Sequence, residues 1–355
     1  MQKTETSGSI RLLKIEIRCP DMNLRSYTMT LSIFFLIFII TLCVTPLIGS
    51  SNISLARAFS DSINISNNAD ANILFQVRLP RILLGALTGA ALSVAGAIFQ
   101  ALLRNDLAAP FTLGVSSGAA LGAVIAIALN LNMSLMGFPV VSLFSFLGSL
   151  GAIMLVFSLV RTRHGEFPTG ILLLAGVTAN FFFAAMVMFI HYLADFSQSF
   201  RIIRWLMGGL DITDYDTILS ITPMVFLGIF ILMFISRDLN LISTGVHSAS
   251  SRGVNVARIQ KVGFITASLI TGTVVATCGP IGFVGLIVPH TVRLFVGPDL
   301  RILIPASMLF GASFLVACDT LARTIIAPTE IPVGIITAIL GGPFFVWLLK
   351  RKRQV

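Results

Sequence analysis

About ten long apolar stretches run through this chain, and each is long enough to cross a lipid bilayer as a helix. Crossing the hydrocarbon core of a bilayer takes about 20 apolar residues in helical form. The stretch 81–103 also places Gly85, Gly89, Ser93 and Gly96 along one helical stripe. Such stripes let helices approach closely in lipid, where no hydrophobic effect brings helices together. The sequence therefore predicts an all-α polytopic membrane protein with about ten transmembrane helices.

The apolar stretches divide the 355 residues into one membrane domain with short flanks. Composition agrees, because only 11% of the residues are charged, whereas a soluble domain has about 25%. We expect a cytoplasmic leader over 1–28, a transmembrane domain over 29–349 that contains an inner loop at 237–261, and a basic cytoplasmic tail over 350–355. The predicted spans cover 29–48, 81–103, 112–130, 139–160, 170–190, 217–236, 261–278, 281–297, 302–322 and 331–349.

Positive charge indicates which ends of the spans face the cytoplasm. If the N-terminus lies inside, 18 of the 24 lysines and arginines fall on the inner side or at its boundary. Cytoplasmic loops of membrane proteins carry such an excess, and shifting the count by one span would remove it. We therefore place both termini in the cytoplasm and interpret the net charge of +9 as an orientation signal, not as a nucleic-acid surface. The basic residues on the outer side are Arg57, Arg78, Arg81, Arg201, Arg204 and Arg323.

The N-terminus allows a second interpretation. Basic residues that include Arg11, Lys14, Arg18 and Arg25 precede the apolar run 29–48, a pattern that resembles a secretory signal peptide with cleavage after Ala56 or Ala58. We prefer an uncleaved first span, because the charged leader is long and an uncleaved span accounts better for the distribution of charge.

The chain lacks the nucleotide-binding loop GxxxxGK[ST], since none of its five lysines completes that pattern. ATP-driven transport would therefore need a separate ATPase. A secondary transporter usually buries ionisable groups near the membrane midplane, but the acid lying well inside a predicted span is Asp319, near its outer end. Arg323 follows four residues later, a favourable helical pairing, so we expect a structural ion pair. We interpret His290, after Pro289, as a packing residue.

The inner loop 237–261 is the longest inner connection, and Gly245, Ala249 and Gly253 recur in it at a spacing of four. This spacing fits two short helices joined at a glycine, or one face that meets another protein closely. An ordinary cytoplasmic loop is the alternative. In the outer loop 191–216, the segment 201–205 has the pattern of a short interfacial helix with an aromatic anchor. The four cysteines show no CxxC spacing, so we expect no metal site and no cofactor in this chain.

Ordered motifs along residues 75–350 resemble a known family. They read RLPR at 78–81, RNDLAAP at 104–110, LAGV at 174–177, GPIGFVGLIVPH at 279–290, LAR at 321–323, EIPVG at 330–334 and GGPFF at 341–345. The chain resembles the FecCD permease family of ABC importers, which take up ferric siderophores, haem and vitamin B12. The residues that we assign to these motifs or to the structure are Gly96, Gln100, Arg104, Asn105, Pro110, Gly114, Gly118, Gly279, Pro280, Gly282, Gly285, Pro289, His290 and Asp319.

The resemblance implies ten helices per subunit, a homodimer with the pathway at its interface, and a location in the bacterial inner membrane, surrounded by lipid. A cytoplasmic ATPase dimer, which binds ATP and Mg²⁺, would lie below, and a periplasmic substrate-binding protein above. The loop 237–261 corresponds to the family's coupling helices, which fit a cleft in the ATPase. The candidate coupling residues are Ser243, Thr244, Gly245, Ala249, Arg252 and Gly253.

This sequence departs from the family in two places. The usual Ser-Leu-Gly followed by acids reads Ser-Thr-Gly-Val-His at 243–247, and Asp106 stands where the family usually has proline. The family's docking arginines correspond to Arg78, Arg81 and Arg323, whose guanidinium groups could pair with carboxylates on a partner. The alternative is that these arginines are snorkelling membrane anchors.

The sequence thus predicts the permease subunit of an ABC importer for a ferric-siderophore-type iron complex, with no catalysis of bond chemistry in this chain. Haem or cobalamin is the alternative cargo within the family. A proton-coupled secondary transporter and a membrane scaffold or sensor are the alternatives from other classes.

Overall fold

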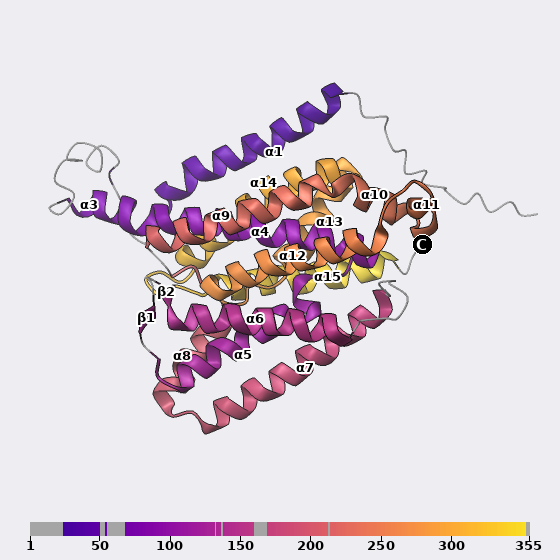
Figure 1. Ribbon diagram of the computed structural model, residues 1–355. Coiled ribbons are helices and arrows are strands. Elements are labelled where there is room, and N and C mark those ends of the chain that lie inside the picture. Colours follow the sequence, from indigo (N-terminus) through magenta and orange to yellow (C-terminus); the bar gives the residue numbers. More distant parts are fainter. Residues whose placement is uncertain are drawn as a thin grey trace, which may run out of the picture.

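The computed structural model describes residues 24–49, 54, 68–131, 133–135, 138–159, 169–211 and 214–352. Most of the predicted leader, the cleavage sites considered after Ala56 and Ala58, and the last residues of the tail lie outside these ranges. Figure 1 shows long helices lying side by side in one bundle, with the connections gathered at its two ends.

The elements follow one another along the chain in this order. The first half contains α1 (Leu24–Val44), η1 (Thr45–Leu47), α3 (Ala69–Asn72), η3 (Ile73–Arg78), α4 (Leu79–Leu103), η4 (Pro110–Leu113), α5 (Val115–Ala128), β1 (Ser134–Leu135), β2 (Phe138–Pro139), α6 (Val140–Leu159) and α7 (Thr169–Leu193). The second half contains α8 (Phe196–Leu206), α9 (Tyr215–Phe234), α10 (Ser236–Thr244), α11 (Val246–Ser251), α12 (Val256–Cys278), α13 (Val284–Val296), α14 (Leu300–Thr324) and α15 (Val333–Lys352).

The described helices confirm the prediction of an all-α polytopic membrane protein. Seven helical stretches are long and apolar enough to cross a membrane, and α5, α13 and α15 are shorter apolar helices. The strands β1 and β2 form only a two-residue antiparallel pair between α5 and α6. The segment 201–205 is helical as predicted, because it lies within α8.

The helix that contains α4 begins well before the predicted boundary at residue 81. The side-chain oxygen of Asn68 caps α3 by accepting hydrogen bonds from the backbone N–H groups of Asp70 and Ala71. From there α3, the π-helical turn η3 and α4 run without a break for 35 residues to Leu103. The sequence reasoning missed this extension because polar residues end the apolar run, although a capped helix can continue beyond it.

The predicted span 281–297 begins later than expected. Gly279 and Phe283 have φ angles of 70° and 65°, and these left-handed conformations separate the end of α12 from the start of α13 at Val284. Pro289 and Pro343 lie inside α13 and α15, which both continue through them.

The helix α4 forms the centre of the bundle, because 89% of the residues in the most apolar part of the stretch Ala69–Leu103 are buried. Its glycine stripe explains how two neighbours approach it. A methyl group at Gly89 would overlap the backbone of Gly311 in α14, and one at Gly96 would overlap the backbone of Gly285 in α13. A second stripe, which contains Gly118 and Gly122, packs α5 against α6, where a methyl group at Gly118 would meet the carbonyl oxygen of Gly148 at 2.6 Å. The interpretation of these stripes as packing surfaces is confirmed.

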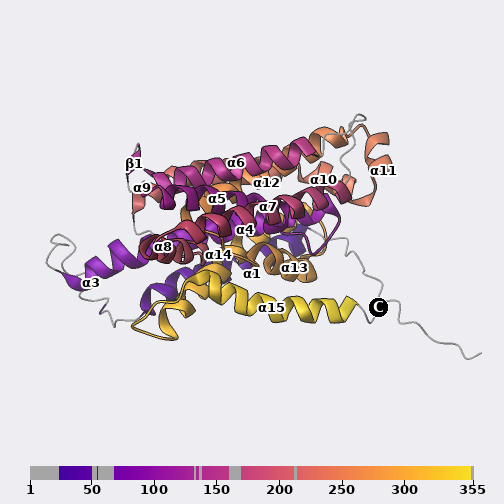
Figure 2. The same ribbon diagram turned by 90° about the horizontal axis from the view of Figure 1, so that it is seen from below.

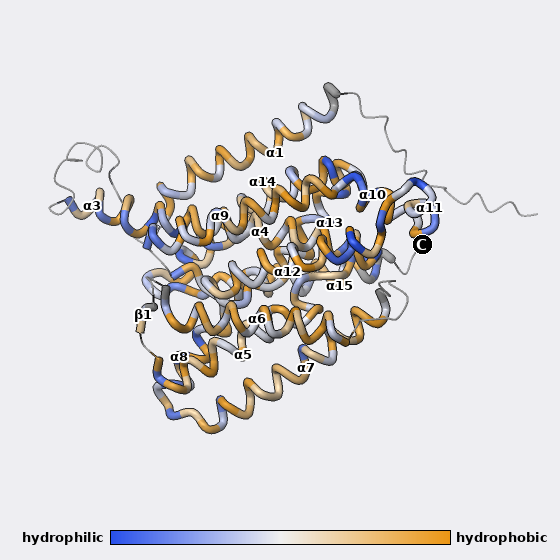
Figure 3. Tube along the Cα trace, viewed as in Figure 1, coloured by the Kyte–Doolittle hydropathy of each residue, from blue (hydrophilic) through white to orange (hydrophobic). Residues whose placement is uncertain are grey.

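The two ends of the bundle carry different elements. Figure 1 places α3, α8 and the β1–β2 pair at one end, which we call the α3 end, and α10, α11 and the C-terminus at the other, which we call the α10 end. Figure 2, turned by 90°, shows the same separation. Figure 3 shows hydrophilic segments gathered around α3 and around α10 and α11, with hydrophobic helices between them. This arrangement is that of a bundle whose middle lies in lipid.

Candidate functional site

Four charged side chains meet at the α3 end, between α4, α14 and the start of α15. We call Arg81, Asp319, Arg323 and Glu330 the charged cluster. The Nε atom of Arg81 donates to both carboxylate oxygens of Asp319, at 3.0 and 3.1 Å. The Nε atom of Arg323 lies 3.1 Å from Oδ2 of the same carboxylate. The expected ion pair within α14 is therefore confirmed, and Asp319 holds a second arginine 238 residues away in the sequence.

The fourth member of the charged cluster comes from the connection between α14 and α15. The Nη1 atom of Arg81 lies 2.5 Å from Oε2 of Glu330, whose side chain is 44% exposed. Arg81 itself is only 6% exposed, so it lies between a buried carboxylate and a surface carboxylate. The cluster ties the ends of α4 and α14 to the connection that leads into α15.

The expectation that Arg78, Arg81 and Arg323 are open to a partner on the outer surface is wrong. They are 3%, 6% and 5% exposed. Arg81 and Arg323 are held by Asp319, and Arg78 donates a hydrogen bond of 2.7 Å to the backbone oxygen of Pro46 after α1. Burial inside the protein also contradicts the snorkelling alternative, which needs the charged group at the lipid surface. Docking of a partner at this end of the bundle stays a prediction.

At the α10 end, the inner loop forms two short helices as one of the sequence-based interpretations predicts, whereas its contact with another protein stays a prediction. The helices α10 and α11 meet at Gly245, whose φ angle of 156° suits glycine. Ser243, Thr244, Arg252 and Gly253 are exposed, as a contact surface requires. Ala249 is 0% exposed and packs inside, so its assignment to the coupling surface is wrong. The spacing of four brought it to one face with Gly245, but that face turns partly toward the bundle.

The motif residues after α4 gather into a second polar cluster, also at the α10 end. Arg293, in the last turn of α13, pairs with Asp106 and donates a hydrogen bond of 3.0 Å to the side-chain oxygen of Gln100. Asn105 accepts a hydrogen bond from the backbone of Leu107 and so shapes the turn. Asp106, which replaces the family's usual proline, thus gives this chain an ion pair between the turn and α13.

Two further motif residues lie beside this cluster. Arg104 ends α4 in a left-handed conformation with a φ angle of 48°, and its Nη2 atom lies 2.5 Å from the backbone oxygen of Ile242 in α10. His290 is 9% exposed, and its ring packs edge-on against Phe344 of α15, with 6.0 Å between ring centroids. The interpretation of His290 as a packing residue is in agreement with this contact.

Glycines that follow α8, follow α12 and lie at the start of α15 form a junction of backbone groups at the α3 end. The N–H of Gly209 donates to the carbonyl of Cys278 at 2.9 Å, and the N–H of Gly334 donates to the carbonyl of Gly208 at 3.2 Å. At Gly279 a Cβ would lie 2.5 Å from the backbone oxygen of Trp205. These contacts join the end of α8, the end of α12 and the start of α15 without the use of side chains.

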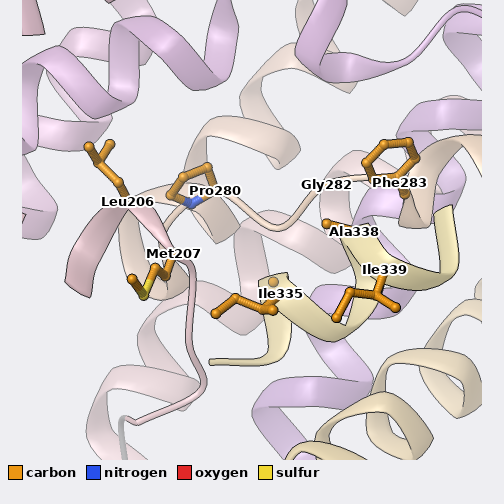
Figure 4. Close-up of a pocket in the computed structure, with 9 residues that line it drawn as sticks. Leu206, Met207, Pro280, Gly282, Phe283, Ile335, Ala338 and Ile339 are labelled. Atoms are coloured by element: carbon orange, nitrogen blue, oxygen red, sulfur yellow. The ribbon is translucent and has the colours of Figure 1, made fainter. Parts of the chain in front are cut away.

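An open apolar groove lies beside this junction, with a volume of about 520 Å³. Figure 4 shows side chains from the end of α8, from the 280–283 connection and from α15 converging on it. It is lined by Leu206, Met207, Pro280, Gly282, Phe283, Gly334, Ile335, Ala338 and Ile339. Sequence reasoning missed the groove because each lining residue looks like an ordinary membrane residue. Among the residues that the structure describes, no group of three or more His, Cys, Asp or Glu is placed to hold a metal ion.

The comparison with protein families decides the affiliation of the chain. The model of the FecCD transport family matches residues 36–351. The chain belongs to the FecCD transport family. The apolar helices of the described residues are thus those of an ABC transporter permease, a transport component.

FecCD relatives with different cargoes match most of the chain. It is 38% identical over 324 residues to the hemin transport system permease protein HmuU of Yersinia pestis, covering 89% of this chain and 95% of that protein. It is 43% identical over 284 residues to the cobalamin import system permease protein BtuC of Halobacterium salinarum, covering 80% and 74%. It is 38% identical over 281 residues to the Fe(3+) dicitrate transport system permease protein FecD of Escherichia coli, covering 79% and 86%.

A solved structure supports the same FecCD fold. A metal-chelate type ABC transporter in an inward-facing conformation superposes with a TM-score of 0.77 and 33% sequence identity. The match covers 92% of this chain and 99% of that chain. The predicted fold class of a permease of this type is therefore confirmed.

Proposed function

We propose that this chain is the permease subunit of an ATP-driven importer that moves a ferric-siderophore-type iron complex across the inner membrane of a bacterium. The observation that carries the cargo class is that relatives named for ferric dicitrate, hemin and cobalamin each match most of the chain. All three cargoes are bulky metal chelates, and two contain iron. A haem or cobalamin permease is the second candidate, which the 43% identity to a cobalamin permease favours.

In this proposal the two ends of the bundle meet different partners. A cytoplasmic ATPase dimer, carrying ATP and Mg²⁺, contacts α10 and α11, because their exposed residues form a protruding polar surface at the α10 end. A periplasmic substrate-binding protein docks at the α3 end. The permease itself catalyses no bond chemistry. It offers two access states, and the ATP cycle of its partner biases them.

The apolar groove supports a homodimer with the pathway at its interface. Ile339 and Leu340 of α15 are 63% and 43% exposed beside the groove. Two copies that face each other across α15 would enclose both grooves and so cover these side chains. Apolar walls offer few polar groups that could bind a chelate whose metal ion is already coordinated. Such a pathway would therefore let the chelate pass without holding it tightly.

Cargo preference is tested by uptake into vesicles that contain the permease with its own ATPase and binding protein. We expect uptake of a radiolabelled ferric siderophore that excess unlabelled hemin or cyanocobalamin leaves unchanged. Competition by hemin or by cyanocobalamin, together with ATP-dependent uptake of that compound, would instead establish the second candidate.

The energy source gives a prediction of its own. The purified chain alone should hydrolyse no more ATP than a mock preparation, because it has no GxxxxGK[ST] loop. Uptake by the complete complex in vesicles should require ATP and should continue when the proton gradient is collapsed. Loss of uptake on collapse of the gradient at constant ATP would support a proton-coupled transporter instead.

The contact with the ATPase can be tested at Thr244, which is exposed at the end of α10. Replacing Thr244 with tryptophan should remove most of the ATPase subunit that co-purifies with the permease, because a bulky ring would separate two closely fitted surfaces. Thr244 is a better test than Gly245 or Gly253, whose φ angles of 156° and 82° would make any substitution strain the backbone.

The matched control for this contact is Ser197→Trp. Ser197 is also exposed but lies in α8 at the opposite end of the bundle, so co-purification of the ATPase should stay at the wild-type level. Wild-type recovery of the ATPase with Thr244→Trp would remove the end of α10 from the proposed interface.

A further inference from the structure

The helix α10 is fastened to the first turn of α14 by one side chain. The Nδ2 atom of Asn240 donates a hydrogen bond of 2.7 Å to Oδ1 of Asp299, and its Oδ1 atom accepts one of 2.9 Å from the backbone N–H of Leu300. Asp299 is itself the N-cap of α14 and accepts a hydrogen bond from the backbone N–H of Arg301. Both ends of the Asn240 amide are therefore used, and both lead to the same helix terminus.

The charge state of Asp299 fixes the orientation of that amide. Burial acts to raise the pKa of Asp299, but the hydrogen bonds from Arg301 and Asn240 outweigh it, and the net pKa lies below the usual range. The ionised carboxylate can only accept hydrogen bonds, so the NH₂ group of Asn240 faces it. The amide oxygen then faces the N–H of Leu300, an otherwise unpaired donor at the start of a helix.

A second attachment joins α10 to α4. Arg104, the residue that ends α4, reaches the carbonyl oxygen of Ile242 with its Nη2 atom at 2.5 Å. Leu239 and Ile242 are each 1% exposed, so the face of α10 that carries these two residues is packed against the bundle. Ser243 and Thr244 follow these attachments at the end of α10 and are exposed.

The helices α4 and α14 are joined along their length. Near the middle, Gly89 lies against Gly311 so closely that no side chain fits between them, and the hydroxyl of Ser93 donates a hydrogen bond of 2.7 Å to the backbone oxygen of Ser307. At the α3 end, the ion pair of Arg81 with Asp319 joins the same two helices. A displacement of α10 must either carry this pair of helices with it or break the attachments named above.

We propose that Asn240 is a positioning residue that transmits displacement of α10 to the joined helices α4 and α14, with Arg104 as the second attachment. This inference rests on the proposed function, because α10 transmits motion only if an ATPase drives it. Removing the attachment should uncouple ATP hydrolysis from transport. The ATPase would still hydrolyse ATP, but a smaller part of the displacement of α10 would reach α4 and α14.

The test exchanges the side chains of Asn240 and Asp299 in two steps. The measured quantity is the ratio of cargo taken up to ATP hydrolysed by the complete complex in vesicles. Asn240→Asp places two carboxylates together, so their contact becomes repulsive. We expect this ratio to fall about tenfold, within the range of typical coupling energies between sites. Adding Asp299→Asn to the same chain restores one amide facing one carboxylate, and asparagine still caps a helix well. The double variant should therefore recover most of the ratio.

The control is Asn68→Asp, the same chemical change at the N-cap of α3 at the opposite end of the bundle. Its ratio should equal that of the wild type. If Asn240→Asp does not assemble with the ATPase, Asn240→Ala removes both hydrogen bonds without adding charge and should lower the ratio in the same direction.

Two results would overturn the inference. One is a wild-type ratio in both single variants at position 240. The other is a double variant that stays as low as Asn240→Asp, since the loss would then not arise from the contact with Asp299. Failure of the proposed function gives a different result, namely a wild-type complex that shows no ATP-dependent uptake at all.

Discussion

Replacing Asp319 with alanine should lower the free energy of unfolding by about 3–5 kcal/mol, the usual cost of removing one partner from a buried ion pair. The carboxylate is 2% exposed and holds Arg81 and Arg323, which are 6% and 5% exposed. Without it, two guanidinium groups face each other out of contact with water, and Glu330 alone reaches one of them. The measurement is thermal or denaturant unfolding of the purified protein in detergent, with yield in the membrane as a second readout.

The matched control for Asp319 lies in the same cluster. Glu330 has a side chain that is 44% exposed, and exposed ion pairs contribute only about 0–1 kcal/mol. Glu330→Gln keeps an oxygen that accepts from Arg81, so its effect should be within that small range. Equal losses from the two substitutions would show that burial of the Asp319 carboxylate does not set the energy of this cluster.

Replacing Gly96 with alanine should prevent most of the protein from folding, although it adds a single methyl group. The new Cβ would overlap the carbonyl and Cα atoms of Gly285, which belong to the backbone of α13 and cannot rotate away. Overpacking a tight interior costs about 1–3 kcal/mol when side chains can adjust, so a backbone contact should reach at least the upper end of that range. The measurement is the amount of monodisperse protein recovered from membranes by size-exclusion chromatography.

Gly151→Ala provides the comparison for Gly96. Gly151 lies within α6 and is exposed, and nothing lies within 4 Å of a Cβ added there. Alanine is the better helix former, so recovery should equal or exceed that of the wild type. Similar losses from both substitutions would indicate that α4 and α13 can separate, which would contradict their close packing.

The features that depend on local spacing could be predicted from the sequence. Apolar runs of about 20 residues gave the helices and their approximate ends, because the length of a span is set by the bilayer. The stripe containing Gly89 and Gly96 marked the helix contacts, and the spacing of Asp319 and Arg323 marked an ion pair within one helix. Each of these follows from the period of a single helix.

The features that depend on distant segments could not be predicted in this way. The pairing of Arg81 with Asp319 joins helices far apart in the sequence, so neither local charge nor the family resemblance, which suggested docking, could show that the fold buries and neutralises Arg81. Ala249 was misplaced for a related reason, since spacing gives a shared face but not the direction in which that face turns. The hydrogen bonds of Asn240 likewise depend on where α14 begins.

Beside the apolar groove, the glycine junction holds the segments together through the backbone, whereas the lining of the groove is formed by side chains. The segments are joined through backbone groups of Gly208, Gly209 and Gly334, whereas the walls are formed by side chains such as Met207 and Ile339. Hydrogen bonds between backbone groups do not depend on the identity of neighbouring side chains. Mutation of the lining residues can therefore change the width and the polarity of the groove while the backbone that supports it keeps its fold.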